Sequence, residues 1–187
     1  MKVIFAQGNP GQQYTKTRHN VGFMALEAFS RDVGAQFTVK PKFKATIAEV
    51  VVNDEKVLLV KPDTFYNETG QSARIILDFY KLSAKDLLVV HDELMLPFGT
   101  VRTRLKGRDA GNNGIKSLNA HVGNDFARIR VGIGATTRAA DTDFVLGMFT
   151  SDEQKELPAI LKVVTDDMTA FINGTFAVTS RTATLTK

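Results

Sequence analysis

The stretch DLLVV, residues 86–90, decides how the chain folds. Its continuous apolar run has no polar face, which is typical of a strand buried on both sides in a parallel sheet. Two further strand-like runs, VIFA at 3–6 and KVLLV at 56–60, precede it in the chain. We therefore expect a central sheet that contains these three strands.

Segments with apolar residues at helical spacing separate the strands. They run from Asn20 to a stop at Gly34, and over 68–82. Another helix is expected to open at 111–114 and to end at Gly123. The last long helix is expected from Ser151, because Ser151 and Gln154 resemble a capping box.

The remaining strand-like runs are FTVK (37–40), ATIAEVVV (45–52) and ARIRVGIG (127–134). Asn53–Asp54 between two strands predicts a hairpin. Strands that alternate with helices, plus one hairpin, predict an α/β fold: a single domain over 1–187, with a twisted mixed, mostly parallel central sheet flanked by helices. The Thr-rich tail at 174–187 has no pattern that predicts an element.

Composition narrows the class of protein. The chain has 187 residues, of which 43% are hydrophobic and 24% charged, as in an ordinary globular domain. It contains no apolar run of roughly eighteen residues, so we expect no membrane span. The apolar run of the N-terminal segment MKVIFAQGNPG is too short for a signal peptide. The absence of cysteine excludes disulfides and thiolate metal sites, and it suits a cytoplasmic protein.

Two stretches concentrate positive charge in a chain of net charge +4. Basic residues fall at every second position in VKPKFKA and VRTRLKGRD, namely Lys40, Lys42 and Lys44, then Arg102, Arg104, Lys106 and Arg108. Residues two apart share a face of an extended segment, so each stretch predicts a basic stripe that could bind a phosphate backbone. An ordinary solvated surface is the alternative.

Polar residues follow the expected strands. Asn9 comes after VIFA, Asn67 after KVLLV and Asp92 after DLLVV, while His19 lies at the start of the first helix. If the strands are parallel neighbours, these side chains converge at the carboxyl edge of the sheet, where ligands bind in open α/β sheets. We interpret them as parts of one hydrolytic site.

The chemistry of this site would depend on His19. The positive end of a helix dipole disfavours an imidazolium, which keeps the ring neutral and able to act as a base. A carboxylate such as Asp92, bonded to the other ring nitrogen, would fix the tautomer. Each residue also has a purely structural interpretation: His19 or Asn67 as a helix cap, Asn9 as a turn former, and Asp92 as a strand end.

Other chemistries have weaker support. His91 and Asp92 are neighbours on a strand and point to opposite faces, so they would not chelate a metal together. HExxH, GxxxxGK[ST] and GxSxG are all absent from the chain. A water activated by a base is the mechanism that remains.

The chain resembles the bacterial peptidyl-tRNA hydrolase family in six motifs that occur in the same order. They are GNPG (8–11) with TRHNVGF (17–23), KPDTFYNETG (61–70), VVHDELMLPFG (89–99), AGNNGIKSL (110–118), RIRVGIG (128–134) and DFVLGMF (143–149). The resemblance implies hydrolysis of the ester between a peptide and the 3′ end of tRNA, by a monomeric enzyme without metal or cofactor.

The resemblance also implies roles for individual residues. His19 matches the catalytic base and Asp92 the carboxylate that orients it, with Asn9 beside the scissile ester. Asn67 and Asn113 match amides that bind substrate, and we also expect Tyr14 and Tyr66 to bind substrate. Arg104 and Arg130 match positive residues that meet tRNA phosphate, and we expect Arg102 and Lys106 of the same basic stripe to bind tRNA with them.

The chain departs from the family pattern at several positions. Tyr66 stands where methionine is common, Asn112 where many members have histidine, and Met95 where an acidic residue is common. The run 107–109 is poorer in glycine. Two alternatives remain: an RNA-binding protein without catalysis on the same scaffold, and a hydrolase of small esters or amides that would not need the arginines.

Overall fold

One sheet runs through the part of the chain that the computed structural model describes, residues 1–134 and 142–183. Its strands are ordered β2-β3-β4-β1-β5-β7-β6-β8. They are β1 (Lys2–Ala6), β2 (Thr38–Lys40), β3 (Ala45–Val52), β4 (Glu55–Pro62), β5 (Leu87–Glu93), β6 (Thr100–Arg104), β7 (Ala127–Gly132) and β8 (Ser180–Thr182).

The four central strands, β4, β1, β5 and β7, are parallel neighbours. All pairs outside this centre are antiparallel. Two antiparallel steps restore the direction, so β2 and β8 run with the central strands, and only β3 and β6 oppose them. The predicted mixed, mostly parallel sheet is confirmed. Of the stretch DLLVV, residues 87–90 lie in β5, whose residues are all buried, and Asp86 ends η5.

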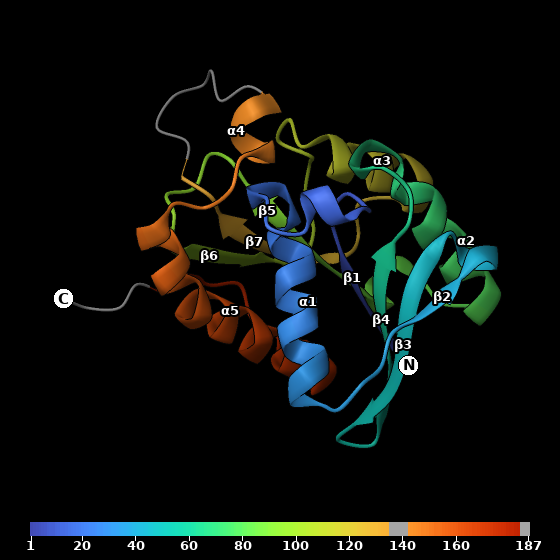
Figure 1. Ribbon diagram of the computed structural model, residues 1–187. Helices are drawn as coiled ribbons and strands as arrows, with labels where there is room; N and C mark the ends of the chain where they lie inside the picture. The colour runs from blue at the N-terminus through green and yellow to red at the C-terminus, as the bar shows by residue number, and fades with distance from the viewer. Residues whose placement is uncertain (135–141, 184–187) are drawn as a thin grey trace.

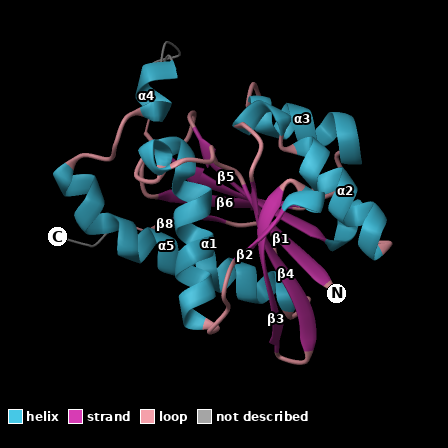
Figure 2. Cartoon of the chain, turned by 45° about the vertical axis from the view of Figure 1, so that its right-hand side comes forward, coloured by secondary structure: helices cyan, strands magenta, loops and turns pink. Residues whose placement is uncertain are grey.

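Helices cover both faces of the sheet (Figures 1 and 2). Helices α1 (Val21–Asp32) and α5 (Ser151–Ile172) pack on one face, and α2 (Gly70–Tyr80) and α3 (Asn113–Val122) on the other. Alternate residues of β1 divide between the two cores, Ile4 toward α1 and Phe5 toward α2 and α3. The short α4 is Thr142–Leu146. Of the described helices, none is long and apolar enough to cross a membrane.

Short 3₁₀ helices form much of the loop structure. They are η1 (Gln12–Tyr14), η2 (Arg18–Asn20), η3 (Pro41–Phe43), η4 (Tyr66–Glu68) and η5 (Ala84–Asp86). Three of them, η1, η2 and η4, follow the carboxyl ends of β1 and β4. They therefore lie at the edge where the sequence predicts the site.

The predicted hairpin between β3 and β4 is confirmed. Asn53 and Asp54 both have positive φ, 49° and 65°. Two successive residues of this kind form the primed turn whose twist matches that of antiparallel strands. The register is set immediately, with Val52 opposite Glu55.

The predicted start of α2 is wrong by two residues and the predicted capping box of α5 by one, whereas α5 begins at Ser151 as predicted. Helix α2 begins at Gly70, because residues 66–68 form η4 instead. The capping box of α5 is Thr150 with Glu153, one residue before the predicted pair. The Thr150 hydroxyl accepts from the Glu153 N–H at 3.2 Å, and the Glu153 carboxylate accepts from the Thr150 N–H at 2.6 Å.

The predicted basic stripe at 40–44 is also wrong. The strand β2 ends at Lys40, and Pro41 begins η3 because its fixed φ suits the first position of a helix. Lys44 then adopts the left-handed conformation, with φ 49°. Lys40, Lys42 and Lys44 therefore do not share one face of an extended segment.

The tail, for which the sequence predicts no element, contains β8, which pairs antiparallel with β6.

Candidate active site

The carboxyl edge of the parallel strands brings together segments far apart in the sequence. The backbone N–H of Gln7, just after β1, donates to the carbonyl oxygen of Val90 in β5 at 2.8 Å. Strand β5 continues to Glu93, so Asp92 lies inside the strand and not after it, contrary to the prediction. His91 and Asp92 therefore point to opposite faces of the sheet.

His19 and Asp92 form the centre of the site. The Nδ1 atom of His19, in η2, lies 2.9 Å from Oδ2 of Asp92. Asp92 is only 2% exposed. A carboxylate accepts but cannot donate, so Nδ1 carries the proton, and Nε2 of the neutral ring keeps its lone pair. The side chain of His19 is 16% exposed, which leaves the ring accessible from the cavity.

Tyr66 contacts both members of this pair. Its ring stacks on the His19 imidazole, with ring centroids 3.6 Å apart and planes 15° from parallel. Its hydroxyl donates to Oδ1 of Asp92 at 2.5 Å and accepts from Nδ2 of Asn112 at 2.9 Å. Burial raises the pKa of the Tyr66 phenol well above its usual value, and the Asp92 charge acts in the same direction. The hydroxyl therefore stays protonated at neutral pH and can donate.

A glycine in α3 makes room for Tyr66. A Cβ added at Gly114 would lie 2.4 Å from Cε1 of the Tyr66 ring, well inside van der Waals contact. Asn112 caps the same helix, with its Oδ1 accepting from the Ile115 N–H at 3.0 Å. One asparagine side chain thus orients both α3 and the Tyr66 hydroxyl.

Asn9 is positioned through two partners. Its Oδ1 accepts from the backbone N–H of Tyr66 at 2.8 Å, which orients the amide. The backbone of Asn9 is held by Asn20, whose Oδ1 accepts from the Asn9 N–H at 2.8 Å and whose Nδ2 donates to the Asn9 carbonyl at 2.9 Å. The Nδ2 of Asn9 makes no hydrogen bond within the described residues.

Sequence reasoning missed Asn20. It occupies the N-cap position of α1, and the motif TRHNVGF was interpreted there as a helix start. Its side chain, however, caps nothing and bonds to the Asn9 backbone instead. The position of Asn20 next to His19, at a helix start, was a signal that Asn20 matters to the site. The sequence did not show, however, that its partner is the backbone of Asn9.

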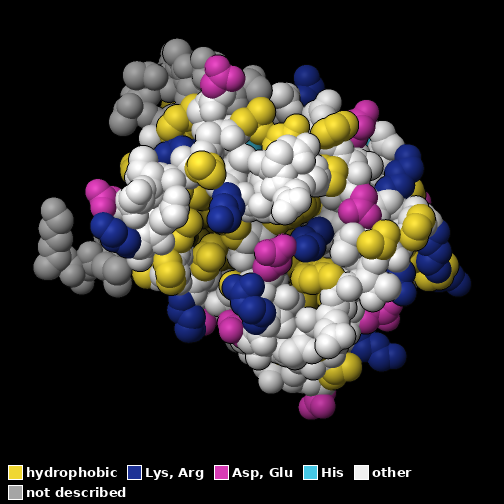
Figure 3. Space-filling model, in the orientation of Figure 1, with side chains coloured by type: hydrophobic (Ala, Val, Ile, Leu, Met, Phe, Trp, Pro, Cys, Tyr) yellow, Lys and Arg dark blue, Asp and Glu magenta, His cyan; other side chains and the backbone are white. Residues whose placement is uncertain are grey.

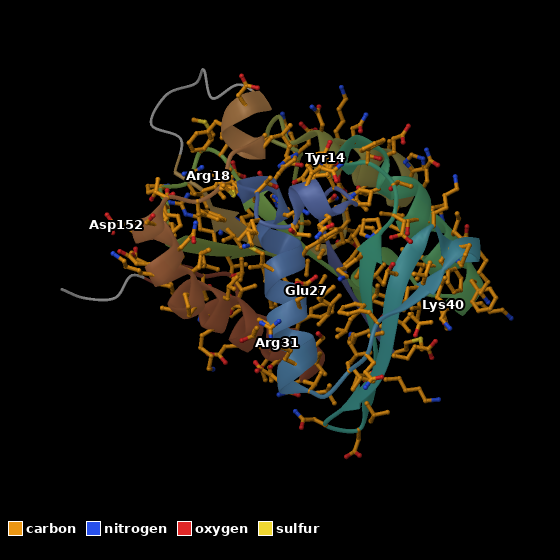
Figure 4. All side chains as sticks on the ribbon, viewed as in Figure 1. Tyr14, Arg18, Glu27, Arg31, Lys40 and Asp152 are labelled. Atoms are coloured by element: carbon orange, nitrogen blue, oxygen red, sulfur yellow. The ribbon has the colours of Figure 1, made fainter. Side chains whose placement is uncertain are left out.

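Arg18, also missed, fixes the segment that carries His19. Its guanidinium donates to the Met148 carbonyl and pairs with Glu153 at 2.6 Å. It also lies 4.6 Å from the centroid of the Phe144 ring. Figure 4 shows Arg18 between η2 and the start of α5. The turn before α1 is thereby joined to a segment about 130 residues later in the chain.

A cavity of about 390 Å³ opens at this pair. It is lined by His19, Tyr66, Asp92, Glu93, Leu94, Met95, Ala110, Gly111, Asn112, Asn113 and Val145. Of the predicted substrate-binding residues, Asn113 and Tyr66 line it. Asn67, exposed on η4, and Tyr14, half-buried on η1 (Figure 4), are not among its lining residues.

Four arginines share the sheet face that bears α2 and α3. Arg102 is opposite Arg130 and Arg104 is opposite Arg128 in the β6–β7 register. Residues that alternate with these arginines along the strands, such as Val101 and Ile129, point into the core under α1 and α5. The core under α2 and α3 includes no residue of β6 or β7 among the described residues, so the arginines are not covered by it. Figure 3 shows the other face, where positive and negative side chains are intermixed.

A second cavity, of about 230 Å³, lies on this arginine face. It is lined by His91, Glu93, Arg104, Lys106, Gly107, Arg108, Asp109, Ala110, Arg128 and Arg130. Glu93 and Ala110 line both cavities, so the basic surface adjoins the His19 site. Arg130 pairs with Glu93 at 2.9 Å, whereas Arg102 donates to Ser180 in β8 at 2.9 Å and is not among the lining residues.

Arg128, missed by sequence reasoning, organises the loop after β6. It is buried and donates to the carbonyl oxygens of Gly107 and Arg108. Burial and the neighbouring Arg130 lower the pKa of Arg128 to about 10, so it remains charged at neutral pH. Its alternation with Arg130 in RIRVGIG was the signal that could have identified it.

The arrangement offers an imidazole that can accept a proton, a buried carboxylate bonded to it, and neutral amides around a cavity. Among the described residues, no group of three or more His, Cys, Asp or Glu side chains is placed to hold a metal ion.

Comparison with known proteins gives a consistent result. A family model described as peptidyl-tRNA hydrolase matches residues 3–187. A peptidyl-tRNA hydrolase of Gloeobacter violaceus is 44% identical over 86% of this chain and 82% of its own length. One from Bartonella bacilliformis is 43% identical over 93% of this chain and 90% of its own. The crystal structure of peptidyl-tRNA hydrolase from Acinetobacter baumannii superposes with a TM-score of 0.88 at 30% identity, covering 93% of this chain and 89% of that one.

The Asn20–Asn9 contact leads to a prediction on stability. Asn20→Ala leaves a buried N–H and carbonyl of Asn9 without partners, so we expect the free energy of unfolding to fall by about 1–3 kcal/mol. Urea denaturation measures this loss. The matched control is Asn124→Ala, at an exposed asparagine, with an expected change within about 0.5 kcal/mol. Equal effects of the two substitutions would contradict the assignment.

Proposed function

Because the chain belongs to the peptidyl-tRNA hydrolase family, we propose that His19 is the general base with which it hydrolyses the ester between peptide and tRNA. The enzyme recycles tRNA from stalled translation by this reaction. One observation carries the assignment of the base: the 2.9 Å contact between His19 and a buried carboxylate, at the mouth of a cavity on the carboxyl edge of the sheet.

The proton transfers follow from this contact. Nε2 of His19 takes a proton from a water molecule as the water oxygen attacks the ester carbonyl carbon. Asp92 stabilises the imidazolium that forms, through the proton on Nδ1. When the tetrahedral intermediate collapses, the bond to the ribose oxygen breaks, and the imidazolium returns its proton to that oxygen. The ester needs no covalent enzyme intermediate for this sequence.

Neutral amides serve the peptide side of the site. The Nδ2 of Asn9 is a donor for the carbonyl oxygen as it becomes negative, a role worth roughly 10²–10³-fold in rate for one donor. Asn113, at the start of α3, binds substrate and positions the attacking water. Asn67 and Tyr14 contact the peptide farther from the ester, on the exposed side of η4 and η1. Amides bond to the peptide backbone and are indifferent to its side chains.

The arginine face serves the tRNA. Arg104, Lys106 and Arg130 line a cavity that adjoins the His19 site, and Arg102 lies on the same sheet face. Positive side chains at this spacing neutralise backbone phosphates and release counterions. The acceptor end of the tRNA would cross this surface while its 3′ ester reaches His19. We further propose that the enzyme acts as a monomer in the cytoplasm, where translation supplies its substrate.

Removal of the base or its carboxylate tests the assignment. For His19→Ala and Asp92→Ala we expect kcat to fall by roughly 10²–10⁴-fold, because general-base help is lost. KM should change little, since the basic surface is intact. The measurement is release of N-acetyl-aminoacyl groups from tRNA. Full activity of His19→Ala would exclude His19 as the base, and an equal loss of binding and turnover in Asp92→Ala would make Asp92 structural.

Salt dependence tests the arginine face. For Arg104→Gln we expect a higher KM, an unchanged kcat, and a slope of log kcat/KM against log salt reduced by about one, because one phosphate contact is lost. Steady-state kinetics from low to physiological salt measure this slope. Arg74→Gln, an exposed arginine of α2 paired with Asp78, is the control and should leave the slope unchanged. A wild-type rate independent of salt would favour a hydrolase of small esters.

A further inference from the structure

Tyr66 is more deeply buried than a substrate-binding residue needs to be. It is only 4% exposed, and its hydroxyl is engaged by Asp92 at 2.5 Å and Asn112 at 2.9 Å. Its backbone N–H is engaged by Asn9. The hydroxyl, which is the one polar group of the Tyr66 side chain, is thus turned toward the protein. The Tyr66 ring covers one side of the His19 imidazole.

We propose that Tyr66 is a positioning residue for the His19–Asp92 pair, and that Asn112 fixes the Tyr66 hydroxyl in the orientation this requires. The proposal rests on His19 acting as the base. It assigns Tyr66 no contact with the reacting atoms. The role would be exerted through the carboxylate, by fixing its rotation and by withdrawing negative charge from the oxygen that faces His19.

The first part of the argument is geometric. Oδ2 of Asp92 bonds to His19, and Oδ1 bonds to Tyr66, so the two contacts together fix the carboxylate plane. With the Tyr66 hydroxyl absent, Oδ1 would lose the one donor that the described residues give it, and Asn112 Nδ2 lies 3.4 Å from the Asp92 backbone carbonyl. The carboxylate would then be free to rotate about its χ2 torsion.

The second part concerns charge. A hydrogen bond from Tyr66 stabilises the Asp92 anion, which weakens its attraction for a proton on His19. Removing that bond should strengthen the attraction of Asp92 for the Nδ1 proton and so stabilise the imidazolium in the free enzyme. Four titratable residues line the cavity: His19, Tyr66, Asp92 and Glu93. Of these, Glu93 is paired with Arg130. Asn112, the N-cap of α3, and Asn113, its first residue, also line the cavity and carry no charge.

The test is the pH profile of kcat/KM for Tyr66→Phe, with N-acetyl-aminoacyl-tRNA as substrate. Phenylalanine keeps the stacked ring and removes only the hydroxyl. We expect the acid limb to move to higher pH by roughly one unit, the plateau kcat to fall about tenfold, and KM to stay near the wild-type value. Tyr80→Phe, at a tyrosine of α2 that packs on Phe43, is the matched control and should change none of these.

A second variant tests the role of Asn112. Asn112→Ser keeps an oxygen that can cap α3 but removes the donor to the Tyr66 hydroxyl. We expect a smaller shift of the acid limb in the same direction, and no further shift when Asn112→Ser is added to Tyr66→Phe. This non-additivity would show that both act on one interaction. If thermal unfolding shows that Tyr66→Phe is not folded, Asn112→Ser alone provides the test.

Other outcomes would overturn the proposal. An unmoved acid limb with a lower melting temperature would make Tyr66 a packing residue. A raised KM with an unmoved limb and unchanged kcat would make it a substrate contact. Additive shifts in the double variant would separate Asn112 from Tyr66. Wild-type hydrolysis that is lost in His19→Ala shows that the proposed base is correct, so any of these results would then reject the role of Tyr66 alone.

Discussion

A carboxylate buried inside a strand is the feature on which the site depends. Burial of a charge costs several kcal/mol unless the charge is hydrogen-bonded and paired. Asp92 meets this condition with one partner for each oxygen, His19 from η2 and Tyr66 from η4. Those two turns follow different strands, β1 and β4, so the parallel order β4-β1-β5 is what brings them to the same carboxylate.

The packing around this contact is tight where the elements approach one another. Gly22 lets α1 lie against the strands, since a Cβ there would meet the Val90 carbonyl at 2.6 Å, and Gly114 admits the Tyr66 ring beneath α3. Tyr66, beneath α3, and Asn112, which caps that helix, bond to each other through the Tyr66 hydroxyl.

The sequence predicted the fold and the centre of the site because both depend on strong local patterns. Apolar runs located β1, β4 and β5, and the residues after them located the carboxyl edge. The contacts of Asn20, Arg18 and Arg128 were missed, because their partners lie 11, 135 and 20 residues away in the chain and local patterns do not show them. The basic stripe at 40–44 failed for a local reason: alternation requires an extended backbone, and Pro41 begins a turn.

The tautomer of His19 is the most direct test of this account, and ¹⁵N NMR of labelled protein measures it. If the Asp92 carboxylate orients the base, the neutral His19 ring should carry its proton on Nδ1 and show an unprotonated Nε2 facing the cavity. The same spectrum of Asp92→Ala should shift toward the Nε2-protonated form, which is the common one in water. A wild-type ring protonated on Nε2 would contradict the account, because such a ring has no lone pair to accept a proton from the attacking water.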